Sequence, residues 1–368
     1  MKGNFSTLTE LAAEIERQES VKNDFIASTQ DLSMREDRTL EVSGAGAFEL
    51  TDHASGQIAD RLSIPRKFYN GLPERAEGLR TDIVNRLLSE QKESRMIRTL
   101  DGNARAYLSD QYRPYDNMMM LSSMLPALQQ FPEVTFRSNA LSETRMYVQM
   151  LFPATETRIG DLLDYHHGDH RGSIKAYSKE AEALIGEALM FGVTLRNSEV
   201  GNGALEVSQT VFSLWCSNLA IGESIIKKAH LGRRLQESDF GNFKSDTIAA
   251  DIEAFRLMFR DVLSTALEET SVKASLAKYA GAALDAPVED PVQTVKNVTE
   301  RYGFTETEAK QIEKNFLTDG RPMNQFGLGN ALTALARELE DPDRGYEIEK
   351  QGFEILTLKP NQWEKLSA

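Results

Sequence analysis

Residues 188–218 read ALMFGVTLRNSEVGNGALEVSQTVFSLWCSN and decide the fold class. Two runs rich in apolar, β-branched and aromatic residues stand on either side of a polar segment, 197–203. Such runs are typical of strands, and the glycines and asparagines between them are typical of a turn. The turn is too short for a helical crossover, so the two strands are expected to pair antiparallel.

The strand signal extends over residues 94–235. The runs SRMIRTL (94–100), ARAYLSD (104–110) and RMYVQMLF (145–152) alternate or are continuously apolar, as half-buried and buried strands are. One helix, predicted over Asn117–Leu128, interrupts these strands. We therefore expect residues 94–235 to form one mostly antiparallel sheet that packs against helices.

Helical patterns dominate the last third of the chain. Asp246 can cap a long amphipathic helix, and two capping boxes are expected, Thr7 with Glu10 and Thr305 with Glu308. The predicted fold class is α+β, with a mostly antiparallel central sheet packed against helices and a helical C-terminal third. Three regions are expected to form one continuous globular unit: an N-terminal helix and short-strand region (1–93), a central β-rich domain (94–240) and a C-terminal helical region (241–368).

The charge of the chain is unevenly distributed. The net charge of −14 over 368 residues argues against nonspecific wrapping of nucleic acid by the whole surface. Residues 1–90 carry 11 basic and 16 acidic side chains, and residues 241–368 carry 15 and 22. Between Arg95 and Arg234 the count is 15 of each sign, so a cationic surface is expected in this middle part.

Several features favour a cytoplasmic protein. No apolar run reaches the length of a membrane span, and the N-terminus lacks the apolar core of a secretory signal. Cys216 is the only cysteine, so an internal disulfide cannot form. Strand alternation places Cys216 on the same face as Phe212 and Leu214, which predicts a buried thiol and not a nucleophile.

One segment, DYHHGDH (164–170), carries candidate metal ligands, because imidazole and carboxylate groups bind transition metals. Neighbouring glycines indicate a loop, and no second ligand cluster with metal spacing occurs elsewhere. A solvated polar loop is therefore the favoured interpretation, and no metal or cofactor is predicted. The candidates are His166, His167, Asp169 and His170.

No pattern of catalytic residues is recognisable. The chain has no Walker A sequence, and GLGNALTALARE (327–338) lacks the preceding strand and the third glycine of a dinucleotide fingerprint. The acidic residues form no spaced set that indicates a two-metal site. These observations predict no catalytic residue and favour a protein that is not an enzyme.

Two basic segments are candidates for nucleic-acid binding. SRMIRTLDGNARAYLSDQYRPY (94–115) interleaves arginines with tyrosines, which supply phosphate contacts and stacking surfaces for bases. IIKKAHLGRRL (225–235) contains four cations and no acid. For the first segment the alternative is a set of solvated ion pairs with Asp101, Asp110 and Asp116. The predicted binding residues are Arg95, Arg98, Arg105, Tyr107, Tyr112, Arg113, Tyr115, Arg196, Asn197, Lys227, Lys228, Arg233 and Arg234.

Three segments resemble the phage/plasmid-like family built on a domain of unknown function. They are ARAYLSDQYRPYDN (104–117), GVTLRNSEVGNGALEVSQTVFSLWCSN (192–218) and NQFGLGNALTALARELED (324–341). The resemblance implies a mobile genetic element in a bacterial host and brings no established activity. It directs attention to Arg105, Ser109, Asp110, Tyr112, Arg113, Asn117, Asn197, Ser198, Glu199 and Gly201.

The leading functional hypothesis is a single-stranded DNA-binding protein that assists recombination, annealing or replication, acting as a homo-oligomer in the host cytoplasm. Whether DNA or RNA is bound stays open. One alternative is a metal-dependent, nuclease-like enzyme that uses the histidine loop. Another is an interaction protein, with a host or phage protein partner, that acts against a host defence factor or in assembly.

Overall fold

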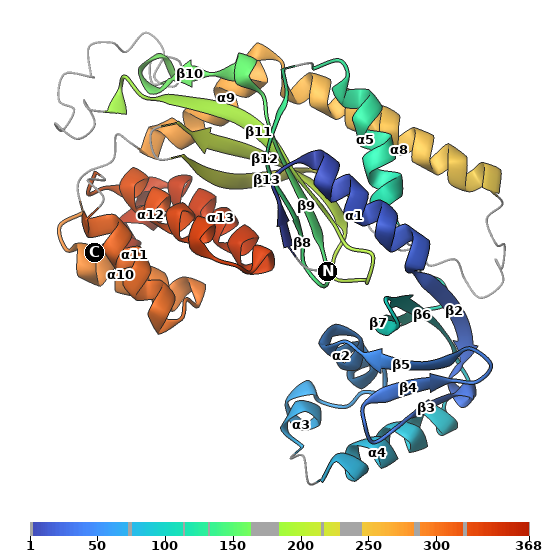
Figure 1. Ribbon diagram of the computed structural model, residues 1–368. Helices are drawn as coiled ribbons and strands as arrows, with labels where there is room; N and C mark the ends of the chain where they lie inside the picture. Colours follow the sequence, from blue (N-terminus) through green and yellow to red (C-terminus); the bar gives the residue numbers. More distant parts are fainter. Residues whose placement is uncertain are drawn as a thin grey trace.

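The computed structural model shows an α+β protein, which confirms the predicted fold class, with two mostly antiparallel sheets and a helical C-terminal third. Each sheet belongs to a separate lobe (Figure 1). We call residues 23–112 the N-terminal lobe and the rest of the chain the main body. The structure describes residues 3–72, 76–112, 115–131, 133–162, 184–214, 217–228, 245–282, 288–318 and 322–367.

The N-terminal lobe is a sheet with helices on one face. Its strand order is β2-β6-β7-β5-β4-β3, and only the β5–β7 pair is parallel among the pairs described. Apolar side chains of the sheet and of the helices form one core, which includes Leu40, Ile58, Val84 and Ile97. The elements are β2 (Asn23–Ser28), β3 (Leu32–Met34), β4 (Thr39–Val42), β5 (Gly46–Leu50), α2 (Asp52–Arg61), α3 (Arg66–Gly71), α4 (Glu77–Glu90), β6 (Ser94–Leu100) and β7 (Asn103–Ser109).

The two strands of 94–109 correct the expectation of a single sheet over 94–235. They pair with β2 and β5 of the N-terminal lobe and not with the strands that follow them. Alternation of apolar residues identifies a strand but not its partner, because every half-buried strand has the same period. Apart from β1 (Gly3–Phe5), the strands of the central sheet therefore follow α5 (Asn117–Leu128), a helix with the predicted bounds.

The main sheet has the order β1-β8-β9-β11-β12-β13, with the short β10 paired to β11. The predicted hairpin of 188–218 is present: β11 and β12 pair antiparallel, with Arg196 opposite Glu206. Thr194 and Thr210 form a buried hydrogen bond of 2.8 Å across the pair. The strands are β1 (Gly3–Phe5), β8 (Thr135–Leu141), β9 (Met146–Leu151), β10 (Thr157–Arg158), β11 (Ala188–Asn197), β12 (Leu205–Ser213) and β13 (Asn218–Lys228).

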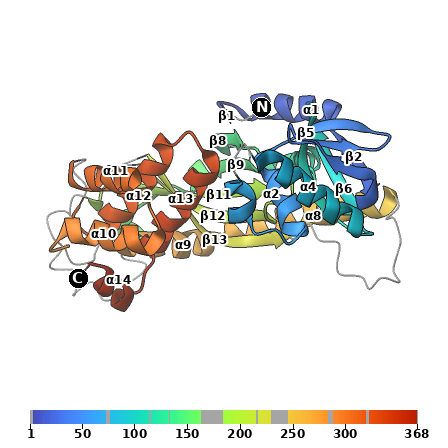
Figure 2. The ribbon, with the colours of Figure 1, turned by 90° about the horizontal axis from the view of Figure 1, so that it is seen from below.

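Helices cover the main sheet, and the views from two sides agree on their placement (Figures 1 and 2). The first group, α1, α5, α8 and α9, shares the largest apolar core with the sheet. The second group, α12 and α13, packs against β13, and α10, α11 and α14 lie outside it around a smaller core. The helices not yet given bounds are α1 (Leu8–Val21), α8 (Ser245–Ala266), α9 (Glu269–Gly281), α10 (Pro291–Tyr302), α11 (Glu306–Thr318), α12 (Gln325–Glu338), α13 (Pro342–Leu356) and α14 (Pro360–Ser367).

Local signals in the sequence explain several of these helices. The Thr7 hydroxyl accepts from the amide of Glu10, whose carboxylate accepts from the amide of Thr7, so the predicted capping box is present. The same exchange occurs between Thr305 and Glu308.

Among the described helices, none is both long and apolar enough to cross a membrane.

Glycines of α12 and α13 allow these two helices to pack closely. A Cβ on Gly329 would lie 2.4 Å from Cγ of Leu356, and a Cβ on Gly352 would lie 2.5 Å from Cγ2 of Thr333. Both distances are too short for real side chains, so α12 and α13 approach each other only because these positions lack a Cβ. Gly329 of the 327–338 segment thus has a packing role between these helices.

Candidate functional site

The turn between β11 and β12 docks on the N-terminal lobe and joins two distant parts of the chain. The carbonyl oxygen of Val200 accepts hydrogen bonds from Nε2 of His53 at 3.0 Å and from Nε2 of Gln57 at 2.8 Å. The Tyr112 hydroxyl donates to the carbonyl oxygen of Ser198 at 3.3 Å. The lobes therefore meet at a polar surface built from α2, the end of β7 and this turn.

A buried ion network lies at the same junction, centred on Arg98. Nη2 of Arg98 is 2.9 Å from the carboxylate of Asp24, and Nη1 is 2.9 Å from the carboxylate of Asp116. Nη1 also donates to the carbonyl oxygen of Glu199 at 2.8 Å. Lys22 contacts Asp116 at 2.5 Å. Burial opposes ionisation of Asp116, but the charges of Arg98 and Lys22 outweigh it and lower its pKa.

A second buried pair continues the network into the main body. Nη1 of Arg105 is 2.8 Å from the carboxylate of Glu199, and both side chains are buried. The other oxygen of Glu199 accepts from the amide of Asn117 at 2.7 Å, at the first residue of α5. Nδ2 of Asn197 donates to the carbonyl oxygen of Tyr115 and to Oδ1 of Asn117, both at 2.8 Å. The turn thus binds the start of α5 and the N-terminal lobe together.

This geometry corrects the expectation that the arginine and tyrosine segment forms an accessible surface. Each of its described candidates is less than a tenth exposed, and a base cannot stack on an aromatic ring that other protein atoms cover. The ion pair with Asp116 that the sequence offered as the alternative is present for Arg98. The buried candidates are Arg95, Arg98, Arg105, Tyr107, Tyr112, Tyr115 and Asn197.

Two further arginines of the predicted set are paired with carboxylates. Arg95 forms an ion pair with Glu93 and lies over the ring of Tyr107. Arg196 lies 2.5 Å from the carboxylate of Glu206, which is itself buried. Neither arginine therefore presents an uncompensated charge.

Part of the predicted set lies outside the described residues. The side chains of Lys227 and Lys228 are also outside the description, although their backbone belongs to β13. The other predicted residues that lie outside the described ranges are Arg113, Arg233, Arg234, His166, His167, Asp169, His170 and Cys216.

Two cavities lie on either side of the docked turn. The small junction cavity, about 300 Å³, is lined by residues of both lobes that include Gln18, Arg105, Arg145 and Glu199. The large junction cavity, about 550 Å³, is lined by His53, Gln57, Asp60, Arg61, Arg66, Tyr107, Leu108, Tyr112, Gly201, Asn202, Gly203 and Ala204.

The large junction cavity carries its positive charge on Arg61. Arg66 forms a two-point ion pair with Asp60, at 2.8 and 2.5 Å. Burial lowers the pKa of His53, so this imidazole is neutral at pH 7. Arg61 is exposed and has no ion pair within the described ranges. An anion at the mouth of this cavity would therefore meet one uncompensated guanidinium group.

The end of β13 pairs with the start of β12, which leads out of the wall of the large junction cavity. In the sheet register, Lys227 lies opposite Glu206 and Lys228 lies opposite Leu205, which directly follows Ala204 of the cavity wall. The sequence analysis identified these lysines but missed Arg61. The basic character of RLSIPRK (61–67) was the available signal.

Within the parts of the chain that the structure describes, no group of three or more His, Cys, Asp or Glu side chains is arranged to hold a metal ion. Comparison with protein-family models, curated proteins and solved structures finds no match for this chain. The resemblance to the phage/plasmid-like family stays a prediction.

Proposed function

We propose that the protein binds single-stranded nucleic acid without catalysing a reaction on it. The strand passes from the large junction cavity to the end of β13. One observation carries this proposal: the sheet register places Lys227 and Lys228 beside the turn that walls the cavity containing Arg61. In this proposal Arg61 and the end of β13, which are far apart in sequence, mark the two ends of one path.

The charge distribution favours a narrow contact with phosphates. In the sequence, Arg233 and Arg234 follow Lys227 and Lys228 after four residues, and no acid occurs between Lys227 and Arg234. The protein as a whole is acidic, with a net charge of −14, which disfavours extended contact with a duplex. A localised basic path on an acidic protein restricts binding to a short stretch of backbone.

The size of the large junction cavity favours a single strand. A base that has left its stack can enter a cavity of about 550 Å³, whereas a paired base stays inside the duplex. Binding of a duplex in this cavity would first require a base pair to open, which costs additional free energy.

The proposed biological setting is the cytoplasm of a bacterium that carries a phage or plasmid. There the protein would assist annealing, recombination or replication by holding single strands. Assembly into a homo-oligomer would join several weak sites on one strand and raise the overall affinity through avidity.

Replacing Arg61 with glutamate tests the path directly. We expect Arg61→Glu to weaken binding of a fluorescently labelled single-stranded oligonucleotide by roughly tenfold, equivalent to about 1.4 kcal/mol. The loss should be similar for different base sequences, because a phosphate contact carries no sequence information. Fluorescence anisotropy titrations measure both quantities.

Lys92→Glu is the matched control, because Lys92 is exposed in the same lobe, lines neither junction cavity and undergoes the same change of charge. It should bind nearly as tightly as the unmodified protein. Equal losses in the two variants would mean that only net charge matters, and the proposed path would be wrong.

A further inference from the structure

The small junction cavity is lined by a buried guanidinium group with an unused edge. Arg105 lines this cavity of about 300 Å³ and is 7% exposed. Its Nη1 pairs with the carboxylate of Glu199 at 2.8 Å. Its Nε and Nη2 are buried and have no hydrogen-bond partner among the described residues. These two nitrogens carry N–H groups that lie side by side on one edge of the planar group.

Two unpaired donors at one buried edge are unusual in a folded protein. Nearly all buried polar groups have a hydrogen-bond partner, because a buried donor without an acceptor is costly. A ligand that supplies two neighbouring acceptor atoms to Nε and Nη2 of Arg105 would remove this cost. The unused edge beside a cavity therefore indicates the chemistry of a ligand.

The backbone of β7 is irregular at this residue. The register pairs Ala104 with Thr99 and Ala106 with Arg98, so Arg105 is an extra residue without a partner on β6. Such a β-bulge interrupts the ladder and re-aims a side chain, and bulges are frequent next to functional sites. The strand thus departs from regular pairing at the residue that carries the unused edge.

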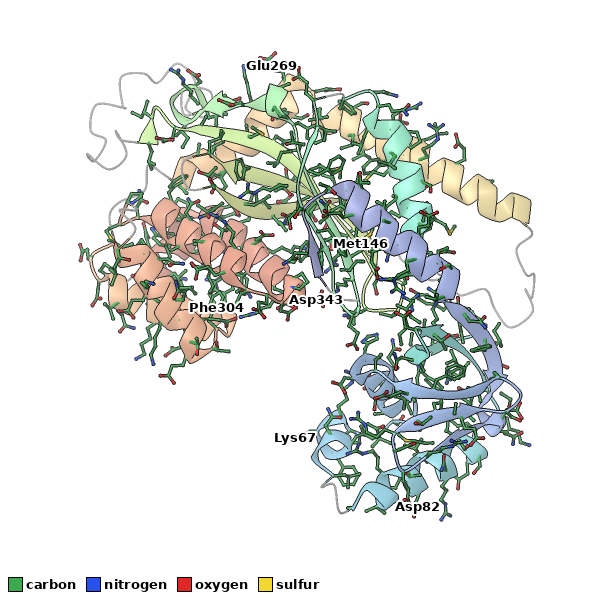
Figure 3. The ribbon with its side chains drawn as sticks, viewed as in Figure 1. Lys67, Asp82, Met146, Glu269, Phe304 and Asp343 are labelled. Carbon is green, nitrogen blue, oxygen red and sulfur yellow. The ribbon has the colours of Figure 1, made fainter. Side chains whose placement is uncertain are left out.

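The charges that line this cavity do not favour a free anion. Three carboxylates and two guanidinium groups line it, so there is no excess of positive charge. Arg105 faces Glu199, and Nη1 of Arg145 lies 3.4 Å from Asp343 in the first turn of α13, which is labelled in Figure 3. A neutral group that carries acceptor atoms therefore fits the lining better than a phosphate or a carboxylate does.

The cavity adjoins the turn that also walls the large junction cavity. Val200 lines the small cavity, and the next two residues, Gly201 and Asn202, line the large one. A single strand that occupies the large cavity thus brings neutral groups with acceptor atoms, its bases, to the same turn.

We propose that the small junction cavity binds one base of the single strand, a guanine or a cytosine, through the Nε–Nη2 edge of Arg105. This inference rests on the function proposed above, because the strand brings the base to the cavity. On binding, a small rotation of the guanidinium group turns its edge toward the base. The volume lies at the lower end of the range for ligand cavities, roughly 300–1,000 Å³, so one base fits and a longer stretch of strand does not.

Guanine and cytosine share the chemistry that this edge requires. Guanine presents O6 and N7 as neighbouring acceptors, and one arginine binds both. Cytosine presents O2 and N3 in the same way on the edge that is exposed in a single strand. Adenine and thymine place an N–H donor beside the acceptors of their exposed edges, so one arginine donor would face another donor. The site should therefore discriminate between bases, which a phosphate contact does not do.

Anisotropy titrations of the unmodified protein test this inference with labelled oligothymidine strands that carry one central dG, dC, dA or 7-deaza-dG. The dG strand or the dC strand should bind about 5- to 150-fold more tightly than unsubstituted oligothymidine, as a bidentate pair discriminates by about this factor. The dA strand should show no gain. If guanine is the ligand, 7-deaza-dG should lose most of the gain of dG, because it lacks the N7 acceptor; if cytosine is the ligand, only dC should show a gain.

Equal affinities for all strands would overturn this inference and leave the proposed function standing. A gain for dA as large as that for dG and dC, or a gain for dG that 7-deaza-dG keeps in full while dC shows none, would also overturn it. Failure of every strand to bind would overturn the proposed function and this inference together.

Arg105→Lys tests the same contact from the side of the protein. Lysine keeps the charge that faces Glu199 but lacks the planar fork, so the base preference should disappear while binding of oligothymidine stays unchanged. Arg95→Lys is the matched control, because Arg95 is also a buried arginine paired with a glutamate and lines neither junction cavity. Circular dichroism confirms that both variants are folded, and the comparison of strands needs neither of them. A preference that persists in Arg105→Lys, or that Arg95→Lys loses equally, would contradict the inference.

Discussion

At the scale of single residues, Arg98 shows why composition misled the sequence analysis. An arginine among tyrosines is typical of a nucleic-acid surface, but it is equally typical of a buried ion network. Asp116 lies near Arg98 in the chain, so this partner could be predicted. Asp24 and Glu199 lie 74 and 101 residues away, and no local pattern indicates that they meet Arg98. The burial of Arg98 therefore could not be predicted from the sequence, because it results from contacts between distant parts of the chain.

The stability of the protein should depend on pH through Glu349. Its pKa rises from 4.5 to about 8 on folding, so between these values the folded protein keeps a proton that the unfolded chain has lost. The stability contribution is fully present below pH 4.5 and is lost as the pH rises toward 8. The loss is at most about 1.4 kcal/mol per pH unit.

Glu349→Gln should not show this loss, so its stability relative to the unmodified protein should increase from pH 5 to pH 8 and then level off. Urea unfolding at a series of pH values measures the difference. Two stability curves that stay parallel over this range would show that Glu349 is already ionised in the folded protein.

At the scale of elements, the hairpin of 188–218 and the helix Asn117–Leu128 could be predicted because their signals are local. The partners of β6 and β7 could not, because alternation carries no information about which sheet a strand joins. The cap of α5 was also beyond prediction: its first amide donates to Glu199, which lies 82 residues away. Elements were thus predictable where their stabilising contacts are near in sequence.

The docking of the β11–β12 turn should depend on Gly201. This residue has φ of 75°, and a Cβ there would lie 2.6 Å from Cδ2 of Leu108. Gly303 has a similar φ of 70°, but a Cβ there would meet no atom within 4 Å. An alanine at either position costs about 1–2 kcal/mol of backbone strain. Only Gly201→Ala should cost a further 1–3 kcal/mol, roughly, from overpacking against the N-terminal lobe.

Urea unfolding of Gly201→Ala and Gly303→Ala compares the two positions under the same backbone strain. A larger loss of unfolding free energy in Gly201→Ala is the expected result. Equal losses would mean that Leu108 moves aside freely and that the turn is not tightly docked.

At the scale of the whole molecule, the α+β class and the helical C-terminal third followed from the sequence, but the division into two lobes did not. The junction is held by charged groups that the sequence distributes over Lys22, Arg98, Asp116 and Glu199. Arg61 lies in the lining of the large junction cavity, and the backbone of β13 ends opposite Leu205, next to the wall of that cavity. The function proposed for the molecule therefore depends on how its lobes meet.

The most direct test of this account is the salt dependence of single-strand binding. The unmodified protein is titrated against labelled single-stranded and duplex oligonucleotides over a salt series, with fluorescence anisotropy as the signal. If Arg61, Lys227, Lys228, Arg233 and Arg234 each neutralise one phosphate, the log–log slope for the single strand should be about −3.5, since each contact contributes about −0.7. The single strand should also bind more tightly than the duplex at every salt concentration. No single-strand binding at about 50 mM salt, or an affinity that does not change with salt, would contradict the account.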